Sequence, residues 1–282
     1  MGGVHPPAPT RRAALLTVGA ALLTATGCGV RLEEDAPNLP FVPTRQPVDG
    51  EAALLTVLAA TTHQQDAGAG ERADLLAEAL AELRVPEASI TAARRRPTPT
   101  VGEDIAAHEA ALRTCPSPLL PQVGRLCVSR LRHGQRELWT ADDDERTWVA
   151  APAAAQAASA TRAAIWGLTV AGAKGDERLR GEVEQDVELL DRLRTRQVSA
   201  GEDGGEDAPL GYQLDEQVGT AGEARALSGA LLARLARSYL GLFAELADDR
   251  SAAHEVVSWT VDVLDRGADR DLSVPELHLD LG

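Results

Sequence analysis

The sequence is poor in aromatic residues, in lysine, in histidine and in cysteine. Phe, Trp and Tyr together make up 3% of its 282 residues, and Lys174 is the only lysine. Alanine and leucine dominate instead, a composition that favours helices packed through small side chains over a β-rich fold. We therefore expect an all-α protein.

Positive charge is also scarce. The net charge is −15 at pH 7, with 43 acidic residues against 28 basic ones. Such a chain should repel nucleic acids and anionic membrane surfaces, so we expect no nucleic-acid partner. The one basic cluster, Arg94-Arg95-Arg96, lies in a segment rich in Pro and Thr. We expect that segment to be a solvated loop rather than a phosphate site.

Sequence motifs of several enzyme classes are missing. The chain has no Gly-x-Ser-x-Gly sequence, no glycine-rich phosphate loop and only six histidines that could act as bases. No cofactor motif is present either. These absences favour a protein that is not an enzyme and that carries no cofactor.

Residues 1–27 are predicted to be a secretory signal peptide. Arg11 and Arg12 precede an uncharged, largely apolar run over residues 13–25, and small residues follow it. The run is shorter than the roughly 20 apolar residues that a membrane-spanning helix requires. The alternative is a buried N-terminal helix with an incidental cysteine after it.

The sequence Ala-Thr-Gly-Cys at residues 25–28 resembles the lipobox of bacterial lipoproteins, with Ala25 where leucine is more common. The resemblance implies cleavage before Cys28 and attachment of a diacylglyceryl group to its thiol, and two acyl chains suffice for stable anchoring. Residues 28–49 contain four prolines and no hydrophobic period, which predicts an extended tether. We therefore expect an extracytoplasmic protein anchored to the outer face of the cell membrane.

Cys115 and Cys127 are the other two cysteines. An even pair in an exported protein predicts a disulfide between them. The alternative is two free, buried thiols, because Cys127 lies on the apolar stripe of a predicted helix.

Beyond the tether, apolar residues recur every three or four positions, which indicates amphipathic helices. Residues 50–145 are predicted to form a helical bundle whose last helix runs from about Leu119 to Trp139, and Pro86 ends one of its earlier helices. Residues 150–267 are predicted to form a second bundle, and residues 268–282 a tail. Four amphipathic helices with short connections are enough for each bundle.

Two features of these helices bear on possible sites. The acidic run from Glu182 to Asp191 interleaves with apolar residues that take the core side, so its carboxylates are expected on a solvated face. Trp139 and Trp148 flank the acidic stretch Asp142 to Glu145 and are candidates for an interface between the two halves.

A family resemblance follows from three segments. The lipobox cysteine precedes "GVRLEEDAPNLPFVPTRQPVDGE", and the C-terminal half contains "GYQLDEQVGTAGEARALSGALLARLARSYLGLFAEL" and "VVSWTVDVLDRG". Together they resemble the ferritin-like domain of unknown function in lipoproteins of high-GC Gram-positive bacteria. The resemblance covers the tether and roughly residues 151–267. It implies an antiparallel four-helix bundle there and says nothing of activity.

Ferritin-like bundles that hold two metal ions use Glu-x-x-His motifs. None of the six histidines here has Glu three positions before it, so a conventional di-metal site is not expected. The remaining candidate metal ligands are Asp104, His108 and Glu109, with Asp104 and His108 one helical turn apart. We expect these three residues to lie on an ordinary solvated helix face rather than to form a metal site, and we expect the same of His254 with Glu255.

These observations predict a membrane-anchored lipoprotein that acts as a non-catalytic binding or scaffold module at the cell envelope. Its expected partners are the membrane, through the lipid anchor, and an unidentified envelope protein or small ligand. The alternative is a small-ligand- or metal-binding ferritin-like bundle that lacks the conventional di-metal site.

Overall fold

The computed structural model describes residues 45–66, 68–132, 136–139, 147–201, 212 and 218–270. The chain divides into two units between Gln46 and Pro47, and only the last two residues of the first unit are described. The predicted signal peptide, Cys28, most of the tether, the acidic stretch at 142–145 and residues 271–282 lie outside the described residues.

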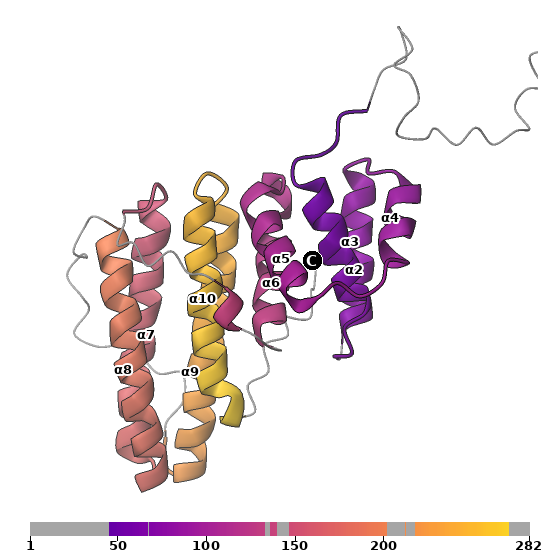
Figure 1. The fold of residues 1–282 in the computed structure, drawn as a ribbon. Coiled ribbons are helices and arrows are strands. Elements are labelled where there is room, and N and C mark those ends of the chain that lie inside the picture. Colours follow the sequence, from indigo (N-terminus) through magenta and orange to yellow (C-terminus); the bar gives the residue numbers. More distant parts are fainter. Residues whose placement is uncertain are drawn as a thin grey trace, which may run out of the picture. The chain divides into compact units, whose positions relative to one another are not determined.

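All regular structure in the described residues is helical, which confirms the all-α fold class (Figure 1). The longer helices are α2 (Glu51–Thr62), α3 (Ala69–Glu82), α4 (Glu87–Arg94), α5 (Val101–Thr114), α6 (Leu120–Arg132), α7 (Ala151–Lys174), α8 (Glu177–Ala200), α9 (Ala221–Leu242) and α10 (Arg250–Gly267). Short 3₁₀ turns are η2 (Ser117–Leu119), η3 (Arg136–Leu138), η4 (Phe243–Glu245) and η5 (Ala268–Arg270). No described helix is both long enough and apolar enough to cross a bilayer.

Helix α2 is the centre of the N-terminal helices and packs against α3, α4 and α5. Leu54, Val57 and Leu58 on α2 are completely buried. The chain enters this helix through Gly50, whose φ of 70° is a conformation that glycine adopts without strain. A Cβ atom there would lie 2.6 Å from the Thr114 side-chain oxygen, so only glycine fits against the end of α5.

The sequence did not predict α4 over residues 87–94, and Arg94, which was expected in a solvated loop, is the last residue of this helix. Ile90 and Ala93 are the only buried residues of this eight-residue helix. Two buried positions do not repeat often enough to produce a helical period in the sequence. The predicted helix from Leu119 to Trp139 is also too long, since α6 ends at Arg132.

The C-terminal helices pack in a chain of neighbours: α7 lies against α8 and α9, and α9 lies against α10. Helix α10 also contacts α5 and α6, so one continuous apolar core runs through both predicted halves. Trp139, after the N-terminal helices, stacks on His254 of α10 with ring centroids 4.3 Å apart, which confirms its expected interface position.

Candidate functional site

Asp104 and His108 lie buried between α5 and α6, where Arg130 joins them. A capping box sets the start of α5: Thr100 N–H donates to the Glu103 carboxylate at 2.9 Å, and Glu103 N–H donates to the Thr100 hydroxyl at 3.3 Å. One turn further on, His108 Nδ1 lies 3.0 Å from Asp104 Oδ1. Arg130 Nε of α6 donates to the other oxygen of Asp104. The three side chains form one ionic cluster.

The charges in this cluster settle the protonation of Asp104. Burial by itself would raise the pKa of Asp104, but His108 and Arg130 outweigh it and the net pKa is lowered. The carboxylate is therefore ionised at neutral pH. His108 Nδ1 also lies 2.9 Å from the Asp104 carbonyl oxygen, and it is the donor in this contact because a carbonyl can only accept.

Cys127 lies next to this pair but is not positioned as a nucleophile. Its thiol is completely buried and donates to the His108 backbone carbonyl at 3.6 Å rather than to the imidazole. Burial raises the pKa of Cys127 well above the ordinary value for a thiol, with a smaller contribution from Cys115. A protonated thiol is a poor nucleophile. The Cys-His-Asp set is therefore not arranged for covalent catalysis.

The predicted Cys115–Cys127 disulfide is not formed in this structure, where both cysteines are free and buried, as in the alternative. Cys115 ends α5, and Arg250 of α10 approaches it: Nη1 lies 3.7 Å from the sulfur and Nη2 donates to the Cys115 carbonyl at 3.0 Å. Burial raises the pKa of Cys115 as well. The contacts between Cys115 and Arg250 thus join α5 to α10 without a covalent bond.

Glu109 turns away from Asp104 and His108 toward α10. Glu109 Oε1 lies 3.5 Å from Nε2 of the buried His254, and the indole of Trp139 stacks on that imidazole with an interplanar angle of 8°. His254, Asp104 and His108 were all expected on solvated faces and are instead 3%, 6% and 0% exposed. Asp104 and His108 thus form one pair, and Glu109 forms a second pair with His254. Among the described residues no three His, Cys, Asp or Glu side chains converge on a possible metal position.

A second polar cluster lies inside the C-terminal helices, where Thr161 (α7), Gln197 (α8) and Tyr239 (α9) are completely buried. Gln197 Nε2 donates to the Tyr239 hydroxyl at 2.8 Å, and Thr161 Oγ1 lies 2.6 Å from that hydroxyl and 2.7 Å from Gln197 Oε1. A closed ring satisfies all three: Gln197 donates to Tyr239, Tyr239 to Thr161, and Thr161 to Gln197. Burial, only partly offset by these bonds, raises the pKa of Tyr239 to about 12. The hydroxyl therefore stays protonated and the ring is structural.

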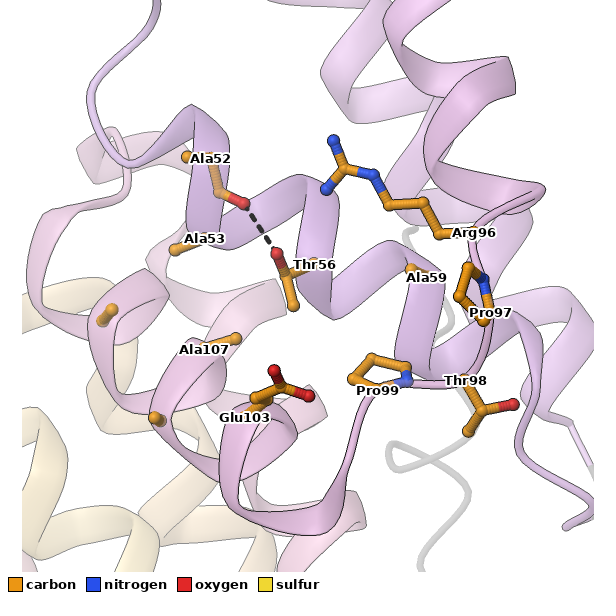
Figure 2. A pocket seen from close by; sticks show the side chains of 12 residues that line it. Ala52, Ala53, Thr56, Ala59, Arg96, Pro97, Thr98, Pro99, Glu103 and Ala107 are labelled. Atoms are coloured by element: carbon orange, nitrogen blue, oxygen red, sulfur yellow. Dashed lines mark hydrogen bonds between the residues drawn. The ribbon is translucent and has the colours of Figure 1, made fainter.

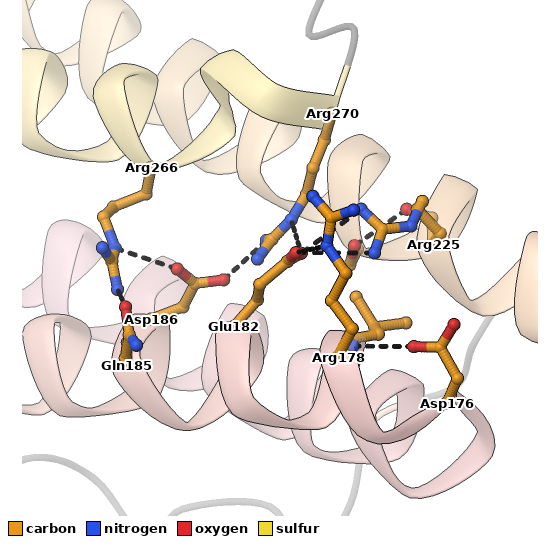
Figure 3. A network of polar contacts seen from close by, with 10 residues as sticks. Asp176, Arg178, Glu182, Gln185, Asp186, Arg225, Arg266 and Arg270 are labelled. Atoms are coloured by element: carbon orange, nitrogen blue, oxygen red, sulfur yellow. Dashed lines mark hydrogen bonds and ion pairs between the residues drawn. The ribbon is translucent and has the colours of Figure 1, made fainter.

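A third cluster joins α8 to the end of α10, and here the expectation of a solvated acidic face is wrong for Asp186 (Figure 3). Asp186 is 2% exposed. Arg266 Nε lies 3.0 Å from one of its oxygens, and Nη1 of the buried Arg270 lies 2.5 Å from the other. Burial raises the pKa of Asp186, and the two arginines offset that rise only in part.

Glu182, one turn before Asp186, extends the same cluster toward α9. Arg178 Nε donates to it at 2.9 Å, Arg225 Nη1 lies at 3.3 Å, and Arg270 Nε at 3.5 Å. Partial burial raises the pKa of Glu182, but these arginines together more than reverse that effect and leave it lowered. Every carboxylate of the cluster is thus matched by arginine within the protein.

An open groove lies elsewhere, between α2, α5 and the loop that leads into α5 (Figure 2). Its volume is about 630 Å³, within the range of small-molecule sites. Six alanines from the two helices line it: Ala52, Ala53, Ala59, Ala106, Ala107 and Ala110. We call it the alanine groove.

The polar atoms of the alanine groove are few. Thr56 Oγ1 donates to the Ala52 carbonyl at 3.0 Å, and Glu103 is engaged with Thr100 in the capping box. Arg96, at one side, is anchored through its backbone carbonyl, which accepts from His63 Nε2 at 2.8 Å. The guanidinium of Arg96 has no hydrogen-bond or ion-pair partner among the described residues. None of the buried acid–base residues of the three clusters lines the groove.

Comparison with protein-family models, with curated proteins and with solved structures gives no significant match for this chain. The roles of the site residues are therefore inferred from their own geometry. The sequence located Asp104, His108, Glu109, His254 and both cysteines, but it did not reveal Arg130, the pairing of His254 with Glu109 or the alanine groove. The contact between Asp104 and Arg130 spans 26 positions of sequence and has no local signal.

Proposed function

We propose that this chain is a non-catalytic binding module, held at the outer face of the cell membrane by a lipidated Cys28. The arrangement around Cys127 is the observation that supports the non-catalytic part of the proposal. The nearest approach to a catalytic set in the described residues has its thiol bonded to a backbone carbonyl and its carboxylate bonded to Arg130. A general base needs a position facing a substrate, and His108 faces none because it is completely buried.

The binding part of the proposal is supported by the alanine groove. It is open, lined mainly by apolar side chains, and free of the ionic clusters that hold the helices together. Ligand sites are typically concave and apolar with a small number of polar groups. The membrane part is supported by the sequence at residues 25–28.

The alternative is a ligand- or metal-binding bundle of ferritin-like type formed by α7–α10. The buried ring of Thr161, Gln197 and Tyr239 is the observation that bears on it, since it places polar atoms at the centre of these helices. The ring has no ionised member near neutral pH, and a divalent cation is poorly served by neutral oxygen ligands alone. We therefore rank this alternative second.

Membrane fractionation of the exported chain tests the anchor. The wild-type chain is expected in the membrane fraction, with a mass increased by its acyl groups. Cys28→Ala should release it, whereas Cys115→Ala should not. Retention of the Cys28→Ala chain in the membrane would contradict the lipid anchor.

Native mass spectrometry of the same exported chain, purified without chelators, tests the absence of a metal centre. The expected mass is that of the lipidated polypeptide without a stoichiometric metal ion. A metal present at one ion or more per chain would overturn the proposal in favour of the alternative. Loss of that metal in a Tyr239→Phe chain would place it in the C-terminal helices.

A further inference from the structure

The alanine groove has a shape and a charge that select its occupant. Its floor consists of alanine side chains on α2 and α5, and residues 97–99 run along one end of it (Figure 2). A packed helix is 10–12 Å across with its side chains and would need a trough that continues past that loop. The occupant must therefore be slender.

The polar atoms of the groove exclude an extended peptide. Beyond the first turn of each helix, the backbone groups of α2 and α5 bond within their own helices, Thr56 is bonded to Ala52, and Glu103 is bonded to Thr100. A bound peptide would leave its amide groups without partners, and each such group costs free energy when it is removed from water. An alkyl chain has no such groups to satisfy.

The charge at the groove points to an anion. Arg96 lies on the lining, is exposed, and has no carboxylate partner among the described residues, although the whole chain carries a net charge of −15. Arg94, two residues earlier, is already paired with Asp74 at 2.7 Å. Glu103 is the other charged residue of the lining, and its carboxylate accepts hydrogen bonds from Thr100 N–H and Oγ1, so Arg96 is the one charged group of the groove without a partner among the described residues. Repulsion from more distant acidic residues is screened beyond about 8 Å at physiological ionic strength.

We propose that the alanine groove binds a single-chain anionic amphiphile of the fatty-acid type, with the alkyl chain on the alanines and the carboxylate at Arg96. The inference rests on the proposed function, since it names the ligand class of that binding module. Arg96 can hold a carboxylate through two parallel hydrogen bonds. The alkyl chain gains from the removal of apolar surface from water.

Titration calorimetry with dodecanoate below its micellar concentration tests this proposal. The exported full chain with Cys28→Ala is the reference, because it lacks acyl groups that would compete. We expect one dodecanoate per chain. Ala106→Phe, at an exposed lining position, should weaken binding at least tenfold by filling the groove, whereas Ala81→Phe, on an exposed face of α3 outside the groove, should not change it.

Arg96→Gln tests the head-group contact separately. It should weaken dodecanoate binding about tenfold and leave the binding of uncharged dodecanol unchanged. Arg95→Gln is the matched control, because Arg95 is exposed but does not line the groove. Equal losses for both ligands in the Arg96→Gln chain would overturn the assignment of the carboxylate to Arg96.

Three results would overturn the proposal as a whole: no binding of dodecanoate to the reference chain, unchanged binding to Ala106→Phe, or binding only to anionic phospholipid vesicles. The last would assign the surface to a membrane instead. Any of these leaves the proposed non-catalytic module standing, because that proposal fails only on the metal and anchor measurements above. A stoichiometric metal ion, in turn, would leave the dodecanoate result unaffected.

Discussion

At the scale of single residues, two buried carboxylates are matched by arginines from other helices. Asp104 of α5 meets Arg130 of α6, and Asp186 of α8 meets Arg266 of α10. A buried carboxylate without such a partner would pay a large desolvation cost. These pairings therefore dictate which helices must lie side by side.

Asp104 should make stability depend on pH in the acidic range. Its pKa is lower in the folded chain than in the unfolded chain, so its contribution is fully present above the unfolded value of about 3.9 and is lost as the pH falls through the folded value. We expect Asp104→Asn to lower the free energy of unfolding at pH 7 by about 1.5–3 kcal/mol, as for a lost hydrogen bond to a charged group. It should also flatten the decline in stability below pH 4.

Urea unfolding at a series of pH values measures both effects. Asp74→Asn is the matched control, since that carboxylate is 72% exposed in its pair with Arg94 and exposed pairs contribute little. If Asp104→Asn kept the acid dependence of the wild-type chain, the lowered pKa of Asp104 would not be the cause of that dependence.

The residues of the clusters also show how far the sequence could predict the site. Asp104 and His108 were found because their partnership is local, at one helical turn. Asp186 was assigned to solvent because its neighbours in sequence are acidic and alternate with apolar residues. Its arginine partners lie 80 and 84 positions away in the sequence. The spacing of apolar residues carries no information about contacts at such a separation.

At the scale of elements, helix ends are set by specific local contacts. Helix α3 ends in a Schellman motif, in which Val85 N–H donates to the Leu80 carbonyl at 3.0 Å and Arg84 N–H donates to the Ala81 carbonyl at 2.9 Å. The motif requires a left-handed residue, and Arg84 takes that conformation with a φ of 61°. An arginine there has a Cβ that the conformation disfavours.

Arg84→Gly should stabilise the protein, because glycine adopts this backbone conformation without the steric cost. We expect a gain of about 0.5–1 kcal/mol in the free energy of unfolding, measured by chemical denaturation. Arg84→Ala keeps the Cβ and should give no comparable gain. A glycine variant no more stable than the alanine variant would contradict the assignment of strain to Arg84.

Element prediction from the sequence succeeded where apolar positions repeat and failed where they do not. The apolar pattern predicts one helix over residues 103–114 and another over residues 153–173, and α5 and α7 agree with these ranges within two residues at each end. Helix α4 was missed because it is short. The end of α6 was placed too late because Leu138 and Trp139 continue the apolar stripe beyond the helix.

At the scale of the whole molecule, the end of the described chain is drawn into the packing rather than left at the surface. The side chain of Arg270 is 3% exposed. A Cβ atom on Gly229 of α9 would lie only 3.2 Å from the Arg270 carbonyl oxygen. Glycine at position 229 thus leaves room for η5 against α9. The arginine then reaches Asp186 and Glu182 on α8.

Arg270→Met should destabilise the protein by about 3 kcal/mol, because it keeps most of the volume but leaves Asp186 buried with one arginine fewer. The double variant Asp186→Asn with Arg270→Met should lose clearly less than the sum of the two single losses, since the unpaired charge is then gone. Guanidinium unfolding of the four chains measures this coupling.

Arg178→Met is a suitable control, because Arg178 is 75% exposed and contacts Glu182 at the edge of the same cluster. Its removal should change stability by less than about 0.5 kcal/mol. Additive losses in the double variant would mean that Asp186 and Arg270 do not stabilise one another.

The fit of Gly50 against the end of α5 has a mechanical consequence. Tension applied to the chain at Pro47 first meets Val48, whose N–H and carbonyl both bond to Glu51. It then meets Gly50, which lies against Thr114 and Cys115 without room for a Cβ atom. Helix α2 also packs against α3, α4 and α5 at once. A pull from the N-terminal side therefore loads several helices together instead of unwinding α2 alone, and the helical unit should resist extension from the end at which a tether would draw on it.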